Sequence, residues 1–137
     1  MFRKIVETCI YSSDLEKMKD FYVNSLGLEF VSEEIGRHVF LKAGKSMLLI
    51  FNPVSTTNKN QSMFPPHGVA TPPASIHFAF EIEKEHYVNV KDRLIRNEID
   101  IEKELTWGNV TMKSIYFRDP AHNLIEFITE GNWPVDD

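Results

Sequence analysis

The sequence contains almost no cysteine and no long hydrophobic run. Cys9 is the one cysteine among 137 residues, so an internal disulfide is excluded and the chain suits a reducing compartment. No stretch approaches the roughly 20 apolar residues that a membrane helix needs, and the N-terminus lacks the apolar segment of a signal peptide. We therefore expect a cytoplasmic protein without a membrane partner.

Basic residues are outnumbered by acidic ones. Fifteen Lys and Arg stand against 20 Asp and Glu, which gives a formal charge of −5. Proteins that bind nucleic acid draw affinity from Lys and Arg gathered on one face, so this composition disfavours a nucleic-acid partner. The apolar share of 42% and the charged share of 26% are typical of a globular protein with its own core.

The same order of elements is predicted twice along the chain. In the first half, residues 4–11 alternate as a strand, 13–26 have helical spacing, and 28–33, 37–42 and 47–51 are predicted strands. Ser13 and Glu16 match a capping box, and Gly27 is placed to end the helix. The second half repeats the pattern, with a strand at 75–82, a helix at 84–97 and strands at 99–103, 111–117 and 123–129. Each half therefore has the order βαβββ.

The two halves are joined by a proline-rich segment, residues 52–74. It holds Pro53, Pro65, Pro66, Pro72 and Pro73 among Ser, Thr and Asn residues, which is typical of a linker or loop. A connection of this length is usually either functional or solvated. One interpretation is that Met63, Phe64 and His67 close over a ligand, and the other is a plain linker.

Three polar residues stand inside predicted strands: Glu7, His77 and Glu126. Glu126 has apolar neighbours on both sides, and a buried carboxylate without a partner is costly. A divalent metal would compensate, and one imidazole with two carboxylates suits Zn, Fe(II), Mn, Co or Ni. A salt bridge or a solvent-facing strand would satisfy the carboxylate without a metal. Glu7 and His77 occupy matching places in the repeat, which favours a shared site.

Other residues are candidates for contact with a substrate. Tyr11 shares the strand face of Glu7, and Arg37 suits a carboxylate or phosphate, although a surface salt bridge is the commoner role. Trp107 and Tyr116 suit an aromatic wall, or ordinary packing. Cys9 is predicted to be a small buried filler, not a nucleophile, because no base is evident beside it.

Several motifs resemble the vicinal oxygen chelate superfamily, which includes glyoxalase I, bleomycin-resistance proteins, fosfomycin-modifying thiol transferases and extradiol dioxygenases. They are Glu-Thr-Cys-Ile-Tyr-Ser-Ser-Asp-Leu at 7–15, Phe-Tyr at 21–22, Leu-Gly-Leu at 26–28, and Phe-Arg-Asp-Pro-Ala-His-Asn-Leu-Ile-Glu-Phe at 117–127. The resemblance implies an α+β fold with two βαβββ modules, residues 1–52 and 75–137, forming curved mixed sheets within one domain. A loop at 53–74 joins them.

The resemblance also implies where a site would form. The modules would make a cup lined by Glu7, His77 and Glu126, and in small members such cups usually form across a homodimer. Glu7 of one protomer would then meet the histidine and the second glutamate of its partner.

Three departures from the family pattern concern the proposed site. The first metal position, most often His or Gln in the family, is Glu7. The fourth ligand of glyoxalase I would fall at Leu49, or at Leu48 if the register slips by one residue. Tyr11 stands where glyoxalase I has an arginine for glutathione. A glutathione-specific glyoxalase is therefore disfavoured.

By this resemblance we expect a metal-dependent enzyme that acts on a small oxygenated substrate. Lyase or isomerase chemistry, thiol transfer and dioxygenase chemistry would all use the same ion, with Glu7 or Glu126 as general base. The alternative is a metal-free drug- or metabolite-binding protein of the bleomycin-resistance type. The complete metal set favours the enzyme, while Leu49 and the unusual Glu7 favour the alternative mildly.

Overall fold

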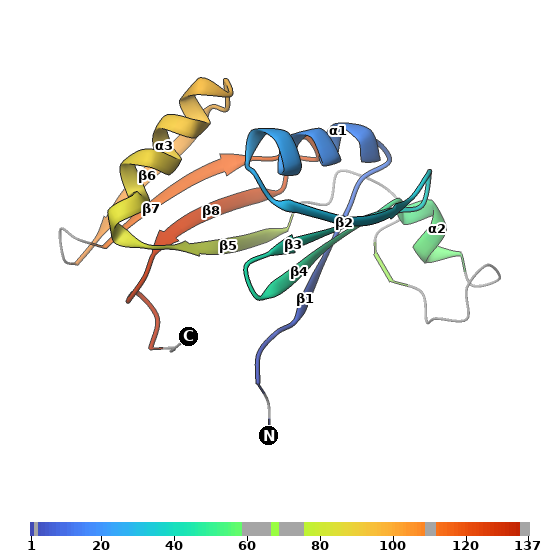
Figure 1. The fold of residues 1–137 in the computed structure, drawn as a ribbon, viewed down its shortest axis with the longest axis horizontal. Coiled ribbons are helices and arrows are strands. Elements are labelled where there is room, and N and C mark those ends of the chain that lie inside the picture. The colour runs from blue at the N-terminus through green and yellow to red at the C-terminus, as the bar shows by residue number, and fades with distance from the viewer. Residues whose placement is uncertain (2, 59–66, 69–75, 109–111, 135–137) are drawn as a thin grey trace. The chain divides into compact units, whose positions relative to one another are not determined.

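The computed structural model describes residues 1, 3–58, 67–68, 76–108 and 112–134, with only the backbone of Trp107. The chain separates into two compact units, Met1–Ala74 and Ser75–Asp137, and each is described by itself (Figure 1). Each unit holds one four-stranded mixed sheet.

The first unit has the predicted βαβββ order. Its elements are β1 (Glu7–Tyr11), α1 (Leu15–Lys19), the π-helix η1 (Asp20–Ser25), β2 (Glu29–Glu34), β3 (His38–Ala43), β4 (Ser46–Phe51) and α2 (Pro53–Thr57). The strand order is β1-β4-β3-β2, with β1 parallel to β4 and the other pairs antiparallel. The predicted strands are confirmed within a few residues of their bounds.

Strand alternation divides the first sheet into two faces. Ile10, Leu41 and Ile50 are fully buried on the face that α1 covers, together with Met18 and Tyr22 from the helical segment. Residues at alternate positions, including Glu7 and its register partner Met47, lie on the face opposite α1. That second face carries the candidate site residues of this unit.

Two details of the predicted helix are wrong. The N-cap is Asp14, whose Oδ1 accepts from the Lys17 amide at 3.1 Å, so Ser13 and Glu16 form no capping box. The helix also changes to π geometry after Lys19, where the Leu26 amide donates to the Phe21 carbonyl five residues earlier. Gly27, with φ of +89°, ends the segment as predicted.

The segment after β4 begins with structure that the proline content did not predict. Asn52 caps α2 by accepting from the Val54 amide at 3.1 Å, and Pro53 occupies the first turn, where its missing N–H costs nothing. The interpretation of 52–74 as a plain linker is therefore wrong at its start. Met63 and Phe64 lie outside the described residues.

The second unit repeats the first. Its elements are β5 (His77–Ile82), the 3₁₀ turn η2 (Lys84–His86), α3 (Tyr87–Arg96), β6 (Ile101–Trp107), β7 (Met112–Arg118) and β8 (Leu124–Thr129). The order β5-β8-β7-β6 matches that of the first sheet, again with a parallel first pair. The α+β fold of two βαβββ modules is thus confirmed.

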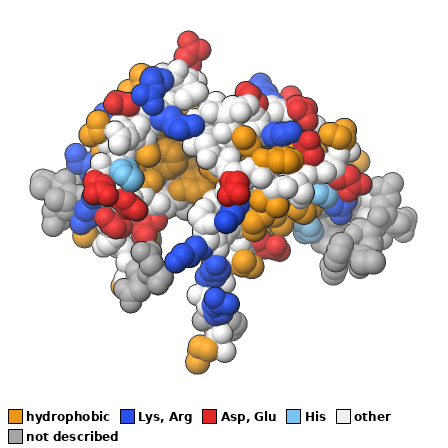
Figure 2. All heavy atoms as spheres, in the orientation of Figure 1, with side chains coloured by type: hydrophobic (Ala, Val, Ile, Leu, Met, Phe, Trp, Pro, Cys, Tyr) orange, Lys and Arg blue, Asp and Glu red, His pale blue; other side chains and the backbone are white. Residues whose placement is uncertain are grey.

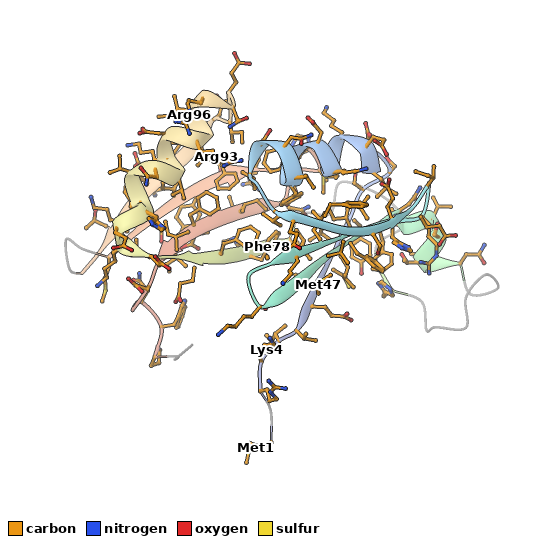
Figure 3. The ribbon with its side chains drawn as sticks, viewed as in Figure 1. Met1, Lys4, Met47, Phe78, Arg93 and Arg96 are labelled. Carbon is orange, nitrogen blue, oxygen red and sulfur yellow. The ribbon has the colours of Figure 1, made fainter. Side chains whose placement is uncertain are left out.

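Helix α3 packs on one face of the second sheet. Leu94 is fully buried, and Tyr87 Oη and Lys91 Nζ donate to the Glu104 carboxylate of β6 at 2.7 and 3.1 Å. Arg93 and Arg96 lie in the last turn (Figure 3), where their positive charge interacts favourably with the negative end of the helix dipole. The face of the sheet opposite α3 carries the second set of candidate site residues.

Hydrophobic side chains also reach the surface of both units (Figure 2). They include Ile5, Ile35 and Val54 in the first unit and Val88 and Trp133 in the second. Among the described residues, no helix combines the length and apolar character needed to cross a bilayer.

Candidate metal centre

Strand register shows which residues of the two units are equivalent. In the register of β5 with β8, His77 of β5 pairs with Leu124 of β8. Two residues further along both strands, Ala79 pairs with Glu126. On β1 and β4, Glu7 pairs with Met47, and Leu49 pairs two residues further along. Leu49 is therefore the counterpart of Glu126, and the first unit has no carboxylate at that position.

His77 and Glu126 lie together on the face opposite α3. His77 Nε2 is 3.2 Å from Glu126 Oε1, and the Glu126 side chain is only 7% exposed against 49% for His77. His77 Nδ1 is 3.0 Å from the Leu124 carbonyl oxygen, which can only accept, so Nδ1 carries the ring proton. In the neutral imidazole Nε2 then presents a lone pair to a carboxylate oxygen. Two acceptors at this distance need a cation or an additional proton between them.

Two hydroxyl groups also contact the Glu126 carboxylate. Ser114, fully buried on β7, donates to Glu126 Oε2 at 2.6 Å. The Tyr116 phenol is hydrogen-bonded to Glu126 and Ser114, and its ring stacks on His77 with centroids 6.1 Å apart. Burial raises the pKa of Tyr116, and the Glu126 charge and hydrogen bond raise it further, although the hydrogen bond with Ser114 opposes this, so the phenol stays protonated. Tyr116 therefore supports the pair directly.

The turn between β7 and β8 fixes the start of β5. Asp119 and Asn123 are buried, and Asp119 Oδ1 accepts from the Ala121 and Asn123 amides, both at 2.9 Å. Asn123 Oδ1 in turn accepts from the Ile76 amide at 3.0 Å, and the Leu124 amide donates to the Ile76 carbonyl. Residue 76 is thereby tied to the turn, so the next residue, His77, is held beside β8.

Sequence reasoning missed Ser114 and the buried Asp119–Asn123 pair as supporting groups. Ser114 did carry a signal, because it alternates with Tyr116 on a strand that also carries the apolar Ile115 and Phe117. The turn residues lie inside the closing motif, where a buried Asp and Asn separated by four residues are typical of a side chain that closes a turn.

In the first unit, Glu7 is exposed at the start of β1, the place equivalent to His77. Cys9, next on the same face, is half-buried, and burial followed by the Glu7 charge raises the pKa of its thiol. A protonated thiol is a weak nucleophile, which agrees with the predicted passive role. The structure thus brings together two of the three predicted ligands, His77 and Glu126, and places Glu7 in the other unit.

A cluster of rings covers the end of the same face of the first sheet. Tyr11 Oη lies 2.5 Å from His67 Nδ1, and both rings pack against Phe51. Gly68, with φ of +94°, lies so close to Tyr11 that a Cβ there would be 2.6 Å from the ring. Residues 67 and 68 of the connecting segment therefore contact β1 directly.

Arg37 stands in the turn before β3, not inside the strand as predicted. Its Nη1 donates to His38 Nδ1 at 2.7 Å and its guanidinium lies over the Phe51 ring, 5.8 Å from the centroid. Burial first, and then the Arg37 charge, lowers the pKa of His38, although Glu34 opposes this. A loose ion pair with Glu34, at 3.8 Å, agrees with the alternative interpretation of Arg37 as a surface salt bridge. The predicted role of Trp107 concerns a side chain outside the described residues.

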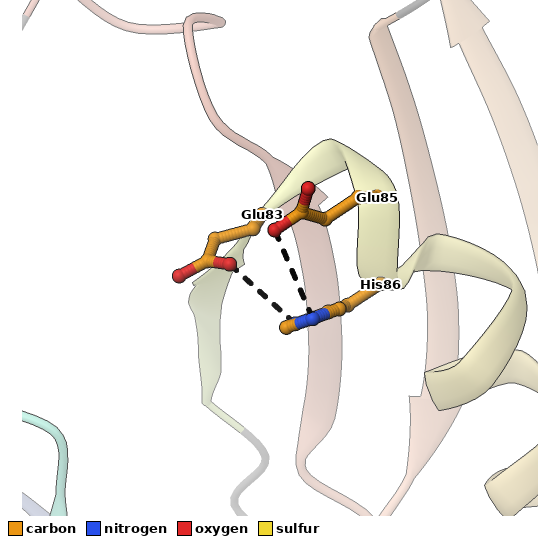
Figure 4. Close-up of side chains that lie close together, drawn as sticks. All are labelled: Glu83, Glu85 and His86. Atoms are coloured by element: carbon orange, nitrogen blue, oxygen red, sulfur yellow. Dashed lines mark ion pairs between the residues drawn. The ribbon is translucent and has the colours of Figure 1, made fainter.

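A second group with metal-binding atoms lies on the surface of the second unit (Figure 4). His86 Nδ1 is 3.6 Å from Glu83 Oε2, and its Nε2 is 3.9 Å from Glu85 Oε1. All three are exposed and neighbours in one short turn, beside an acidic hollow that includes Glu81 and Glu130. Water solvates such groups, so they need no ion, in contrast to the buried Glu126.

Two βαβββ units of matching topology, with a histidine and a carboxylate on one sheet face, define the class of paired βαβββ proteins. The chain belongs to the Glyoxalase/Bleomycin resistance protein/Dioxygenase superfamily, whose family model matches residues 4–127. The resemblance found in the sequence is thus confirmed.

Solved structures agree with this assignment. A lactoylglutathione lyase from Agrobacterium tumefaciens is 34% identical, with a TM-score of 0.87 over 97% of this chain and 98% of that one. A glyoxalase/bleomycin resistance protein/dioxygenase from Nocardioides is 20% identical, with a TM-score of 0.74 over 100% and 91%. A genomically encoded fosfomycin resistance protein from Listeria monocytogenes is 18% identical, with a TM-score of 0.71 over 96% and 97%. The last two share the fold.

Proposed function

We propose that this protein is a divalent-metal-dependent enzyme that acts on a small oxygenated molecule by lyase or isomerase chemistry. The supporting observation is the pair of acceptors, His77 Nε2 and Glu126 Oε1, that face each other at 3.2 Å. Because Nδ1 is hydrogen-bonded to the Leu124 carbonyl, Nε2 and the Glu126 oxygen both have lone pairs that a metal cation can accept.

The donor set fits a transition metal. His77 and Glu126 would hold the ion together with Glu7, whose place on β1 matches that of His77 on β5. One nitrogen and two carboxylates suit Zn, Ni, Mn, Co or Fe(II), and three protein ligands leave positions for substrate oxygens. Leu49 supplies no fourth ligand. By analogy with small relatives, we propose a cytoplasmic homodimer that brings Glu7 of one protomer to the pair of its partner.

We propose separate roles for the bound ion, the proton-transfer residue and the residues that contact the substrate. A bound divalent ion would stabilise negative charge that develops on a substrate oxygen. We assign proton transfer to Glu7, because it is exposed while both oxygens of Glu126 have partners in the second unit. Tyr11 and Arg37 would contact the substrate from the first unit, and Tyr116 and Trp107 from the second.

The choice of lyase or isomerase chemistry follows the 34% identity to a lactoylglutathione lyase. The substrate is proposed to differ, because Tyr11 and Leu49 depart from the pattern of a glutathione-specific enzyme. Tyr11 is hydrogen-bonded to His67 and packs on Phe51. This position therefore carries an aromatic side chain where a glutathione-specific enzyme would have a positively charged arginine. We expect little turnover of S-lactoylglutathione and preference for a compact substrate without a peptide carboxylate.

A metal-free drug- or metabolite-binding protein is the second candidate. The ring cluster of Tyr11, Phe51 and His67 supports it, because aromatic surfaces bind flat apolar ligands without any ion. The two candidates differ in one measurable property, the retention of a metal.

The test is elemental analysis of protein purified without chelators, repeated after loading with Zn, Mn, Fe(II), Co and Ni separately. We expect about one ion per chain, lost in His77→Ala and kept in the matched control His86→Ala, which removes an exposed imidazole. Unchanged metal content in His77→Ala would remove the proposed centre. Absence of binding for every ion would favour the metal-free binding protein.

A further inference from the structure

We propose that Ser114 is a positioning residue that makes Glu126 present a single oxygen toward His77. The inference rests on the proposed metal centre and adds a residue that the metal-ligand pattern does not contain. It is carried by the different contacts of the two oxygens of one buried carboxylate, Ser114 at Oε2 and His77 at Oε1, beside the Tyr116 phenol that also contacts this group.

Ser114 is hydrogen-bonded to one oxygen of Glu126, and the other oxygen faces His77. Its hydroxyl, fully buried, donates to Oε2 at 2.6 Å, while Oε1 lies 3.2 Å from His77 Nε2. In the register, Ser114 pairs with Ile128 on β8, so it lies diagonally across from Glu126 on the same face. The bond is intra-sheet and is therefore fixed by the ladder of β7 and β8.

The hydrogen bond matters because a glutamate carboxylate otherwise rotates easily. The terminal torsion of Glu is broad, with no strong staggered preference, so packing alone does not decide which oxygen points where. With Oε2 bound to Ser114, Oε1 is the oxygen that the carboxylate turns toward His77 Nε2. Without that bond, Oε2 is able to swing toward an ion held by His77 and join it.

The difference changes how many positions remain for a substrate. A single-oxygen Glu126 gives three protein ligand atoms with His77 and Glu7, whereas a two-oxygen Glu126 gives four. The fourth would occupy a position that a substrate oxygen needs. Ser114 would thus keep the centre open, a task distinct from stabilising the fold.

The experiment compares Ser114→Ala with Ser114→Thr, which retains a hydroxyl, and with Thr129→Val as matched control. Thr129 is a buried hydroxyl on β8 whose Oγ1 accepts from the Lys113 amide at 2.9 Å, on the face opposite Glu126. Its loss should lower the unfolding temperature without touching the carboxylate. Each protein is titrated with Co(II), and the visible absorption spectrum, the Co(II) Kd and the unfolding temperature in chelator are measured.

We expect Ser114→Ala to change the Co(II) spectrum toward the weaker absorption of a higher coordination number and to change Kd by about 10- to 100-fold. Ser114→Thr should restore the spectrum, and Thr129→Val should leave spectrum and Kd as in the wild type. A Ser114→Ala spectrum identical to that of the wild type, with Kd within about twofold, overturns the inference alone. Failure of the wild type to bind Co(II) overturns the proposed metal centre and the inference with it.

Discussion

Replacing Glu126 by glutamine should stabilise the metal-free protein and abolish the stabilisation that metal gives. The carboxamide oxygen can accept from Ser114, and the amide nitrogen can donate to His77 Nε2, which faces it as an acceptor. The contact at 3.2 Å then becomes a hydrogen bond that needs neither a cation nor an additional proton.

The magnitude follows from three changes. The new hydrogen bond contributes about 1 kcal/mol, and relief of a buried carboxylate about 1–3 kcal/mol. Against this, the hydrogen bonds that the Ser114 and Tyr116 hydroxyls donate each weaken by about 1 kcal/mol, because their acceptor is then neutral and no longer charged. The net expectation is a Glu126→Gln variant about 1 kcal/mol more stable than the wild type without metal.

The assay is urea unfolding at about pH 8.5, where imidazoles are ordinarily neutral, with chelator and with zinc. At 100 times Kd, zinc should raise the unfolding free energy of the wild type by about 2.7 kcal/mol and that of the variant by little, so the order of stability reverses. A variant about 3 kcal/mol less stable in chelator would refute the reasoning, because it would mean that Glu126 forms a true ion pair with protonated His77.

Three further predictions concern the rest of the molecule. Glu98 has φ of +57° just after α3, so Glu98→Gly should raise the unfolding temperature by about 3 °C, and Glu98→Ala, which keeps the strained φ, should not. The Tyr87 hydrogen bond, and then Lys91, lowers the pKa of Glu104, so this contribution to stability exists above the ordinary carboxyl range and disappears as pH falls through the lowered value. Tyr87→Phe should therefore be less stable by under about 1 kcal/mol near pH 6, and this difference should shrink in thermal unfolding as the pH falls through the lowered pKa of Glu104. Light scattering should give the mass of a homodimer, and a stable monomer would contradict the shared site.

Most of the fold could be predicted because alternation and helical spacing are properties of single elements. β5 alternates clearly between exposed and half-buried positions, and its bounds differ from the predicted ones by only a few residues. The misses have local physical causes. Asp14 is as good a cap as Ser13 and simply lies one residue later, and the π geometry after Lys19 depends on packing that periodicity does not encode.

The site was predicted less completely. His77 and Glu126 are visible in the sequence because a polar residue in an apolar strand needs an explanation. Their contact depends on register, since one residue of slip would turn Glu126 to the other face. Ser114 was missed because its alternation with Tyr116 is a weak signal for a residue type that is ordinary in strands, and its 2.6 Å bond to Oε2 is visible in the structure alone. Arg37 was misplaced because it is the last residue of the turn before β3, and periodicity does not fix the boundary of an element to a single residue.

The replacement of a carboxylate by Leu49 has a consequence for engineering. The duplicated frame is symmetric, but the two halves have diverged, since the first holds rings around Phe51 and the second holds the His77–Glu126 pair. A mutant library confined to the ring cluster would therefore change this aromatic surface while the residues of the pair and their hydrogen bonds stay untouched. The same βαβββ frame thus carries an aromatic cluster in the first unit and a histidine–glutamate contact in the second.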